Sequence, residues 1–195
     1  MRITGGKARS IPIRCPASIT STRPATDKLR TSLFSSLGPL VEGTHCLDLF
    51  AGVGSYGLEA LSRGAQSVTF VEKSRRLIPI IEANIQATQK SLNAAPPPAT
   101  SVLCLDALTW QSPKTFGLIF ADPPYALLEK EGQRILKQLE RLLAPAPHAR
   151  LILEAPGNWH PPENIPFTEL KRLARGPHNP TAIIYRYAPL TPQEP

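Results

Sequence analysis

The chain has 195 residues, of which 42% are hydrophobic, and this length and composition predict one domain with a single substantial core. No run of about 18 apolar residues occurs and no apolar leader stretch is present, so a transmembrane protein is excluded and a cytosolic one expected. The three cysteines at 15, 46 and 104 are odd in number and far apart, which argues against a disulfide framework and a zinc site; we expect no metal.

Positive charge is concentrated near the start of the chain. Residues 1–45 carry seven basic and two acidic side chains, and so hold five of the seven net positive charges. A basic N-terminal segment on a nearly neutral body favours a polyanionic partner such as a nucleic acid. Within it, 26–37 has apolar residues at helical spacing and predicts an amphipathic helix. The candidate phosphate contacts are Arg2, Lys7, Arg23, Lys28 and Arg30.

From residue 45 onward, short apolar runs alternate with longer helical stretches, a pattern typical of an α/β fold with a parallel sheet. The predicted strands are 45–50, 67–72, 101–105, 116–121 and 150–154, and the predicted helices are 56–62, 75–90 and 127–143. A Gly-Pro-His-Asn-Pro turn between 167–174 and 181–187 predicts an antiparallel hairpin, which brings the sheet to seven strands. We therefore expect a basic segment at 1–44, the main domain at 45–188 and a disordered tail at 189–195.

A glycine-rich loop is expected where the first strand turns into the following helix. The sequence from Asp48 to Gly57 reads D-L-F-A-G-V-G-S-Y-G, which permits close approach of a ligand to the backbone and to the N-H groups of the helix. The motif also fits a dinucleotide site, or a tight turn without a ligand. Acidic residues at the next two strand ends could accept hydrogen bonds from ribose hydroxyls and from an adenine amine. The candidate cofactor residues are Asp48, Phe50, Gly52, Gly54, Gly57, Glu72 and Asp106.

A second motif, Ala121-Asp122-Pro123-Pro124-Tyr125, follows the apolar run FGLIF directly. Ligands of open α/β sheets bind at the carboxyl ends of strands, so this motif should face the same crevice as the glycine loop. Prolines donate no backbone hydrogen bond, which leaves carbonyl oxygens and the Asp122 carboxylate to accept from an amino group. The Tyr125 ring offers a surface on which an unstacked base can lie. The alternative is a rigid turn with a packed tyrosine.

Together, the motifs D-x-F-x-G-x-G-x-x-G and D-P-P-Y resemble those of class I methyltransferases that modify exocyclic amines. More narrowly, three segments are similar to the RsmD family: RITGGKAR at 2–9, RPATDKLR at 23–30 and GLEALSRGA at 57–65. The resemblance implies a Rossmann-like fold, S-adenosylmethionine as methyl donor, and methylation of guanine N2 in 16S ribosomal RNA, either as naked RNA or within an assembling small subunit. We expect a monomer. Val53, Tyr56 and Ala121 depart from the family pattern.

Three other functions compete with this interpretation. A methyltransferase acting on DNA adenine or a protein glutamine would use the same D-P-P-Y chemistry, although no DNA-recognition domain is evident. A nicotinamide-dependent oxidoreductase would explain the glycine loop and Glu72 but would leave residues 122–125 without a role. A noncatalytic RNA-binding assembly factor would explain the basic segment alone.

Overall fold

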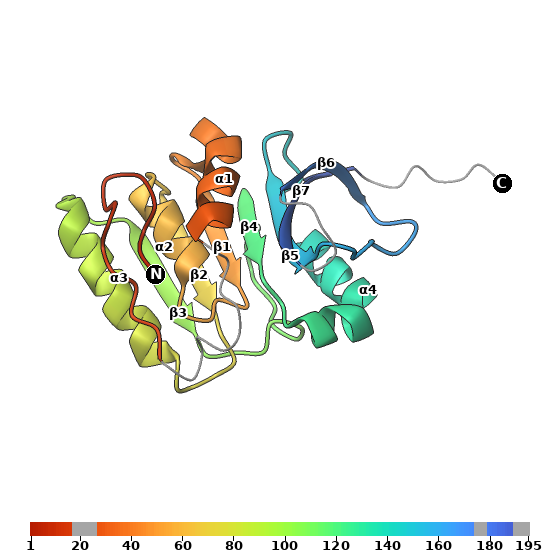
Figure 1. Cartoon of the computed structure of the whole chain (residues 1–195), viewed down its shortest axis with the longest axis horizontal. Helices are drawn as coiled ribbons and strands as arrows, with labels where there is room; N and C mark the ends of the chain where they lie inside the picture. The colour runs from red at the N-terminus through yellow and green to blue at the C-terminus, as the bar shows by residue number, and fades with distance from the viewer. Residues whose placement is uncertain (17–26, 174–178, 189–195) are drawn as a thin grey trace.

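A computed structural model describes residues 1–16, 27–173 and 179–188. The sheet has seven strands in the order β3-β2-β1-β4-β5-β7-β6 (Figure 1). β1 to β5 run parallel to one another, whereas β7 is antiparallel to both β5 and β6. The strands are β1 (His45–Leu49), β2 (Ser67–Val71), β3 (Ala99–Leu103), β4 (Leu118–Ala121), β5 (Arg150–Pro156), β6 (Phe167–Leu173) and β7 (Pro180–Tyr187). The predicted parallel sheet with a C-terminal antiparallel hairpin is confirmed.

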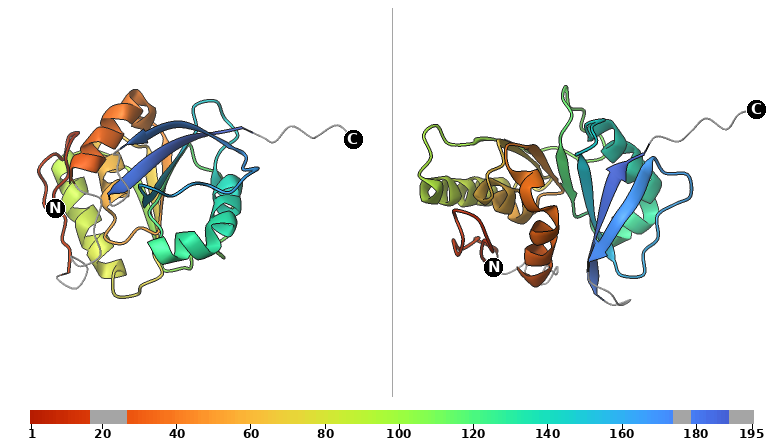
Figure 2. Two further views of the ribbon diagram at one scale, coloured as in Figure 1. Left: turned by 45° about the vertical axis from the view of Figure 1, so that its right-hand side comes forward. Right: turned by 90° about the horizontal axis from the view of Figure 1, so that it is seen from above.

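Helices cover both faces of this sheet. The core on one face joins strand residues such as Phe70 and Phe120 to α1, α2 and α3, and the core on the other joins Ile119 and Leu153 to α4 (Figure 2). Consecutive strand residues alternate between the two cores, as the pleat requires. The helices are α1 (Asp27–Leu37), η1 (Gly38–Val41), α2 (Ser55–Ser62), α3 (Ile78–Leu92) and α4 (Tyr125–Leu142). No helix in the described part of the chain is long and apolar enough to cross a membrane.

Two element boundaries differ from those predicted by enough to matter for the site. The third strand ends at Leu103, two residues earlier than expected, so Asp106 lies in the loop beyond it. The fourth helix begins at Tyr125, directly after the prolines, because Pro124 occupies its N-cap position. Proline favours a helix start because its fixed φ and missing N-H cost nothing there.

The N-terminal segment packs on the main domain. Its Thr4 donates two hydrogen bonds of 2.8 Å to Glu59 of α2, and Arg14 exchanges hydrogen bonds with Asn84 of α3. Gly6 has a φ of 76°, and a Cβ there would lie 2.0 Å from the Ser62 carbonyl oxygen. Residues 1–15 therefore lie close against α2 and α3 rather than extending away from the sheet.

Candidate functional site

The two motifs meet at one edge of the sheet. β4 pairs in register with β1 and with β5, so that Leu49, Ala121 and Leu153 lie side by side. The glycine loop follows β1, and Asp122 follows β4. Both motifs therefore lie at the carboxyl ends of neighbouring strands.

The three glycines of the loop have different surroundings. A Cβ on Gly52, whose φ is 59°, would meet no atom within 4 Å, so open space adjoins the backbone there. A Cβ on Gly54 would lie 3.2 Å from the Phe70 ring, and one on Gly57 only 2.2 Å from it. Gly57 is therefore explained by the packing of α2 on β2. Gly52 is the position that leaves room for a ligand.

Asp48 holds the loop to the helix. Its carboxylate is 2% exposed and accepts a 2.8 Å hydrogen bond from the Gly57 N-H, which lies in the first turn of α2. The pKa of Asp48 is raised to about 7, mainly by burial; the hydrogen bond from Gly57 opposes this rise, and the charge of Glu72 adds to it. Phe50, in the loop itself, has a φ of 66° and is half-buried. Asp48 thus shapes the loop from inside.

Glu72 also binds the loop, from the neighbouring strand. Its Oε2 accepts a 2.8 Å hydrogen bond from the Gly52 N-H, and its Oε1 accepts one of 2.7 Å from the Ser74 N-H. Each carboxylate oxygen has two lone pairs, so one bond apiece leaves capacity for further donors such as hydroxyls. Glu72 is half-buried and lies beside the open space at Gly52.

Asp106 is placed by two contacts of its own. It accepts a 2.8 Å hydrogen bond from Nζ of Lys73 and one of 3.0 Å from the Leu108 N-H. Both hydrogen bonds lower the pKa of Asp106, and the bond from Lys73 has the larger effect. It therefore remains a carboxylate at neutral pH, half-buried, at the end of the sheet formed by β2 and β3.

The strand-end motif continues from the core of β4 into α4. Asp122 is half-buried, Pro123 buried, Pro124 exposed and Tyr125 half-buried. Desolvation raises the pKa of Asp122 well above its ordinary value, and the nearby charges of Glu154 and Asp48 act in the same direction. The motif therefore offers a titratable carboxyl group and a partly accessible aromatic ring within four residues.

Two further residues belong to this edge and were not predicted from the sequence. Glu154, on β5, is 1% exposed, and Tyr56, on α2, is 3% exposed. Oη of Tyr56 donates a 2.5 Å hydrogen bond to Oε2 of Glu154, and its ring stacks on Phe120 with centroids 5.6 Å apart. The sequence showed Glu154 only as the end of an apolar run and Tyr56 only as a departure from the family pattern.

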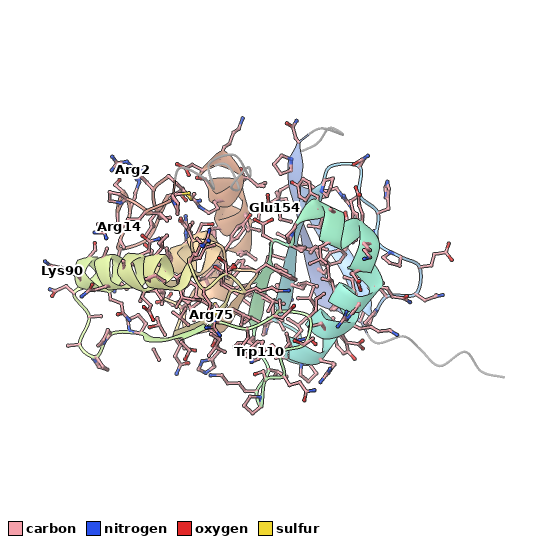
Figure 3. All side chains as sticks on the ribbon, turned by 90° about the horizontal axis from the view of Figure 1, so that it is seen from below. Arg2, Arg14, Arg75, Lys90, Trp110 and Glu154 are labelled. Atoms are coloured by element: carbon pink, nitrogen blue, oxygen red, sulfur yellow. The ribbon has the colours of Figure 1, made fainter. Side chains whose placement is uncertain are left out.

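The expected phosphate contacts fall into three groups. Arg2, Lys7 and Lys28 are exposed, and Arg23 lies outside the described residues. In Figure 3, Arg2 and Arg14 lie at one end of the molecule, near Lys90 of α3. These exposed cations are available to a polyanion.

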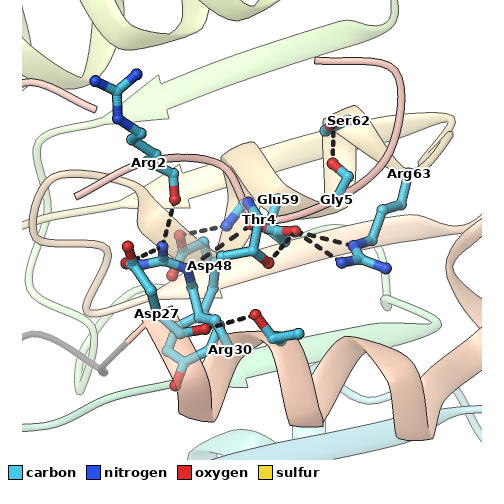
Figure 4. Close-up of polar contacts among 12 residues, drawn as sticks. Arg2, Thr4, Gly5, Asp27, Arg30, Asp48, Glu59, Ser62 and Arg63 are labelled. Carbon is cyan, nitrogen blue, oxygen red and sulfur yellow. Dashed lines mark hydrogen bonds and ion pairs between the residues drawn. The ribbon is translucent and has the colours of Figure 1, made fainter. Parts of the chain in front are cut away.

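Arg30, by contrast, is wholly buried. Its Nη2 donates hydrogen bonds of 2.6 Å to the Arg2 carbonyl and 2.7 Å to Oδ1 of Asp27 (Figure 4). Its Nε lies 3.8 Å from Oε2 of Glu59. Arg30 was expected among the phosphate contacts, but in this structure residues 1–15 fold over it. In this conformation Arg30 links residues 1–15 to α1 and α2, and its side chain has no exposed surface with which to contact RNA.

Comparison with known proteins agrees with this arrangement. The family model described as Conserved hypothetical protein 95 matches residues 1–181. A putative rRNA methyltransferase of Bacillus subtilis, YlbH, is 36% identical over 125 residues, which cover 64% of this chain and 67% of the relative. Ribosomal RNA small subunit methyltransferase D of Escherichia coli is 37% identical over 134 residues, which cover 67% of this chain and 64% of the relative. The chain thus matches about two thirds of the length of these relatives.

Solved structures extend the likeness over almost the whole chain. A putative methyltransferase of Escherichia coli, yhhF, superimposes with a TM-score of 0.73 at 28% identity, covering 97% of this chain and 99% of that one. A putative methylase of Haemophilus influenzae, HI0767, gives 0.71 at 26% identity, covering 96% and 98%. The methyltransferase fold is therefore shared from the N-terminal segment to the last strand.

Proposed function

Because this chain belongs to the Conserved hypothetical protein 95 family, which the comparisons link to ribosomal RNA small subunit methyltransferase D, we propose that it methylates ribosomal RNA, with S-adenosylmethionine as methyl donor. The finer proposal is transfer to the exocyclic N2 of a guanine in 16S ribosomal RNA, in the cytoplasm. The observation that carries the proposed amine methylation is the placement of Asp122-Pro-Pro-Tyr125 directly beside the glycine loop.

The residues at the strand ends fit the proposed cofactor. Open space adjoins the Gly52 backbone, Glu72 retains acceptor capacity for ribose hydroxyls, and Asp106 is a carboxylate that can accept from an adenine amine. When bound, S-adenosylmethionine would supply an electrophilic methyl group on a sulfonium. Asp48 and Gly57 would act indirectly, by holding the loop in shape.

The D-P-P-Y residues would orient the substrate amine. The guanine amine is a weak nucleophile because its lone pair is delocalised into the ring. Hydrogen bonds from this amine to Asp122 and to the Pro123 carbonyl would direct the lone pair away from the ring, and an ionised Asp122 can accept the proton that the nitrogen releases. Tyr125 would support the extruded base by stacking.

Transfer to nitrogen needs no covalent enzyme intermediate, in contrast to methylation at pyrimidine carbon 5, which uses a cysteine nucleophile. Of the free cysteines, Cys46 is buried within β1 and burial raises its pKa to about 12. The thiol of Cys46 is thus held neutral at physiological pH. Neither the glycine loop nor the D-P-P-Y motif contains a cysteine, and this favours amine over carbon methylation at the site.

The test is to map methylated nucleotides by mass spectrometry in ribosomal RNA from cells lacking this gene, from wild type, and from cells complemented with Asp122→Ala. We expect one N2-methylguanine of 16S RNA to disappear and to return only with the parental gene. Transfer from labelled donor to naked RNA and to isolated small subunits then identifies the preferred substrate. Binding of RNA without any transfer would instead support the noncatalytic assembly factor.

A further inference from the structure

The carboxyl groups of Asp48, Asp122 and Glu154 lie near the carboxyl ends of their strands, on the face of the sheet covered by α1, α2 and α3. Registered residues on parallel strands direct their side chains to the same face. Ala121, the last residue of β4, is registered with Leu153, and Asp122, which follows it, lies close enough to Glu154 to feel its charge. Asp48 of β1, registered with Phe120, lies on that face of the sheet as well. Asp122 and Glu154 therefore form an acidic pair, and only Asp122 belongs to the D-P-P-Y motif.

Glu154 is held far more firmly than a solvated strand end would be. It is 1% exposed, and Tyr56 donates its phenolic hydrogen to it across 2.5 Å. The tyrosine is itself fixed, since its ring lies parallel to Phe120, within 2°, and Phe120 also stacks on Phe34 of α1. A phenol in this position favours the ionised form of Glu154.

The charges around the pair decide where its protons reside. Burial raises the pKa of Glu154 to about 7, while Tyr56 and the positive charge of Arg30 oppose that rise. Burial first, and then the negative charges of Glu154 and Asp48, raise the pKa of Asp122 well above its ordinary value. The hydrogen bond from Tyr56 stabilises the Glu154 anion, and the negative charge of Glu154 in turn opposes the ionisation of Asp122.

We infer that Glu154, held by Tyr56, is a positioning residue that controls the protonation of Asp122 and so the pH range in which Asp122 can accept from a substrate amine. The inference rests on the proposed amine methylation and deepens it. A protonated Asp122 accepts hydrogen bonds weakly and cannot take up the amine proton. Transfer should therefore rise with pH as Asp122 loses its proton, and Glu154 should set the position of that rise.

The first measurement is the pH profile of single-turnover methyl transfer to ribosomal RNA. Glu154→Gln removes the charge but keeps an acceptor for Tyr56, so the acidic limb should move to lower pH by about one unit or more, as expected when a like charge is removed. Tyr56→Phe should move the acidic limb in the same direction by a smaller amount. Without the hydrogen bond from Tyr56, Glu154 is protonated more readily, and its charge then opposes the ionisation of Asp122 less. The double variant should move no further than Glu154→Gln alone, because Tyr56 acts through Glu154.

Controls separate this mechanism from a general charge or folding effect. Glu82→Gln, at an exposed position of α3, removes the same charge and should leave the profile unchanged. Tyr56→Phe retains the stacking ring and both carboxyl groups, and so keeps the test decisive if Gln is not tolerated at 154. An acidic limb that coincides in the parent, Glu154→Gln and Tyr56→Phe would overturn the inference.

The second measurement does not depend on activity. Carbon-detected NMR of side-chain carboxyl groups in the protein without cofactor would assign Asp122 as the resonance lost in Asp122→Asn. Its titration midpoint should fall in Glu154→Gln, and an unchanged midpoint would also overturn the inference. If the parent transfers no methyl group at any pH, the proposed function fails, while this titration still decides whether Glu154 controls Asp122.

Discussion

The backbone N-H of Gly52 donates a 2.8 Å hydrogen bond to Oε2 of Glu72, which joins the loop after β1 to the acidic residue after β2. The same carboxylate accepts from the Ser74 N-H. We therefore propose two functions for Glu72, because it fixes the loop and would also accept a hydrogen bond from a ribose hydroxyl.

Glu72→Ala should weaken S-adenosylmethionine binding by about 1 to 3 kcal/mol, the usual loss for hydrogen bonds made to a charged group. Isothermal calorimetry of the purified variant measures this directly. Glu82→Ala, on the exposed face of α3, is the matched control and should bind like the parent. Equal affinity in the parent and Glu72→Ala would remove Glu72 from the site.

Gly57→Ala should destabilise the fold, because the new Cβ would lie 2.2 Å from the Phe70 ring and 2.9 Å from Val68. Overpacking of this kind costs about 1 to 3 kcal/mol, enough to outweigh the better helix propensity of alanine. Urea unfolding gives the free energy. Gly132→Ala in α4 is the control, because its Cβ would meet Trp159 only at an ordinary 3.9 Å. Equal stability of the two variants would contradict the packing explanation of Gly57.

Local patterns predicted most of the fold. Apolar runs and periodicity predicted the first five strands and the four α-helices, and a turn signature predicted the C-terminal hairpin. The strand-end rule placed residues 48–57 and 122–125 at the same edge. What could not be predicted depends on contacts between distant residues. Tyr56 and Glu154, which share a hydrogen bond, are 98 positions apart in the sequence. The Arg2 carbonyl and the Arg30 side chain that donates to it are 28 positions apart. Arg30 occupies a helix whose charges resemble a solvated face, and nothing local indicates that residues 1–15 cover it.

Asp122→Ala should nearly abolish methyl transfer while leaving cofactor affinity almost unchanged. The substitution removes the acceptor that orients the amine, an electrostatic contribution whose loss typically lowers the rate by about 10² to 10³-fold. The proposed cofactor contacts at Gly52 and Glu72 are untouched. Single-turnover transfer to RNA, together with calorimetry of the cofactor, makes the comparison. An Asp122→Ala enzyme that transfers at the parental rate would refute the amine-orienting mechanism.

Tyr125→Ala should raise the KM for RNA as well as lower turnover, because stacking of a base on an aromatic ring is worth about 1 to 3 kcal/mol. Tyr125→Phe preserves the ring and should retain much of the activity. The two variants are compared by steady-state transfer over a range of RNA concentrations. If Ala and Phe behave alike, the ring of Tyr125 does not support the base.

The exposed cations of the N-terminal part should bind RNA phosphates, whereas the buried one should act on stability. In the triple variant Arg2→Gln, Lys7→Gln, Lys28→Gln, RNA affinity should fall, and the dependence of log K on log salt should flatten by about 0.7 to 0.9 for each lost phosphate contact. All three side chains are exposed, and the hydrogen bond from Arg2 to the Ser10 carbonyl also lies at the surface, so folding and cofactor binding should change little. Filter binding at several salt concentrations measures the slope.

Arg30→Ala completes the comparison, because it removes one positive charge from the same segment but at a wholly buried position. Loss of its hydrogen bonds to Asp27 and to the Arg2 carbonyl should lower the free energy of unfolding by about 1.5 to 3 kcal/mol, the range for bonds to a charged group. Under conditions in which the variant remains folded, the salt slope for RNA should equal that of the parent, since a cation without exposed surface releases no counterions from RNA. A flattened slope in Arg30→Ala with unchanged stability would show that Arg30 reaches the RNA after all, and an unchanged slope in the triple variant would show that its three cations only face solvent.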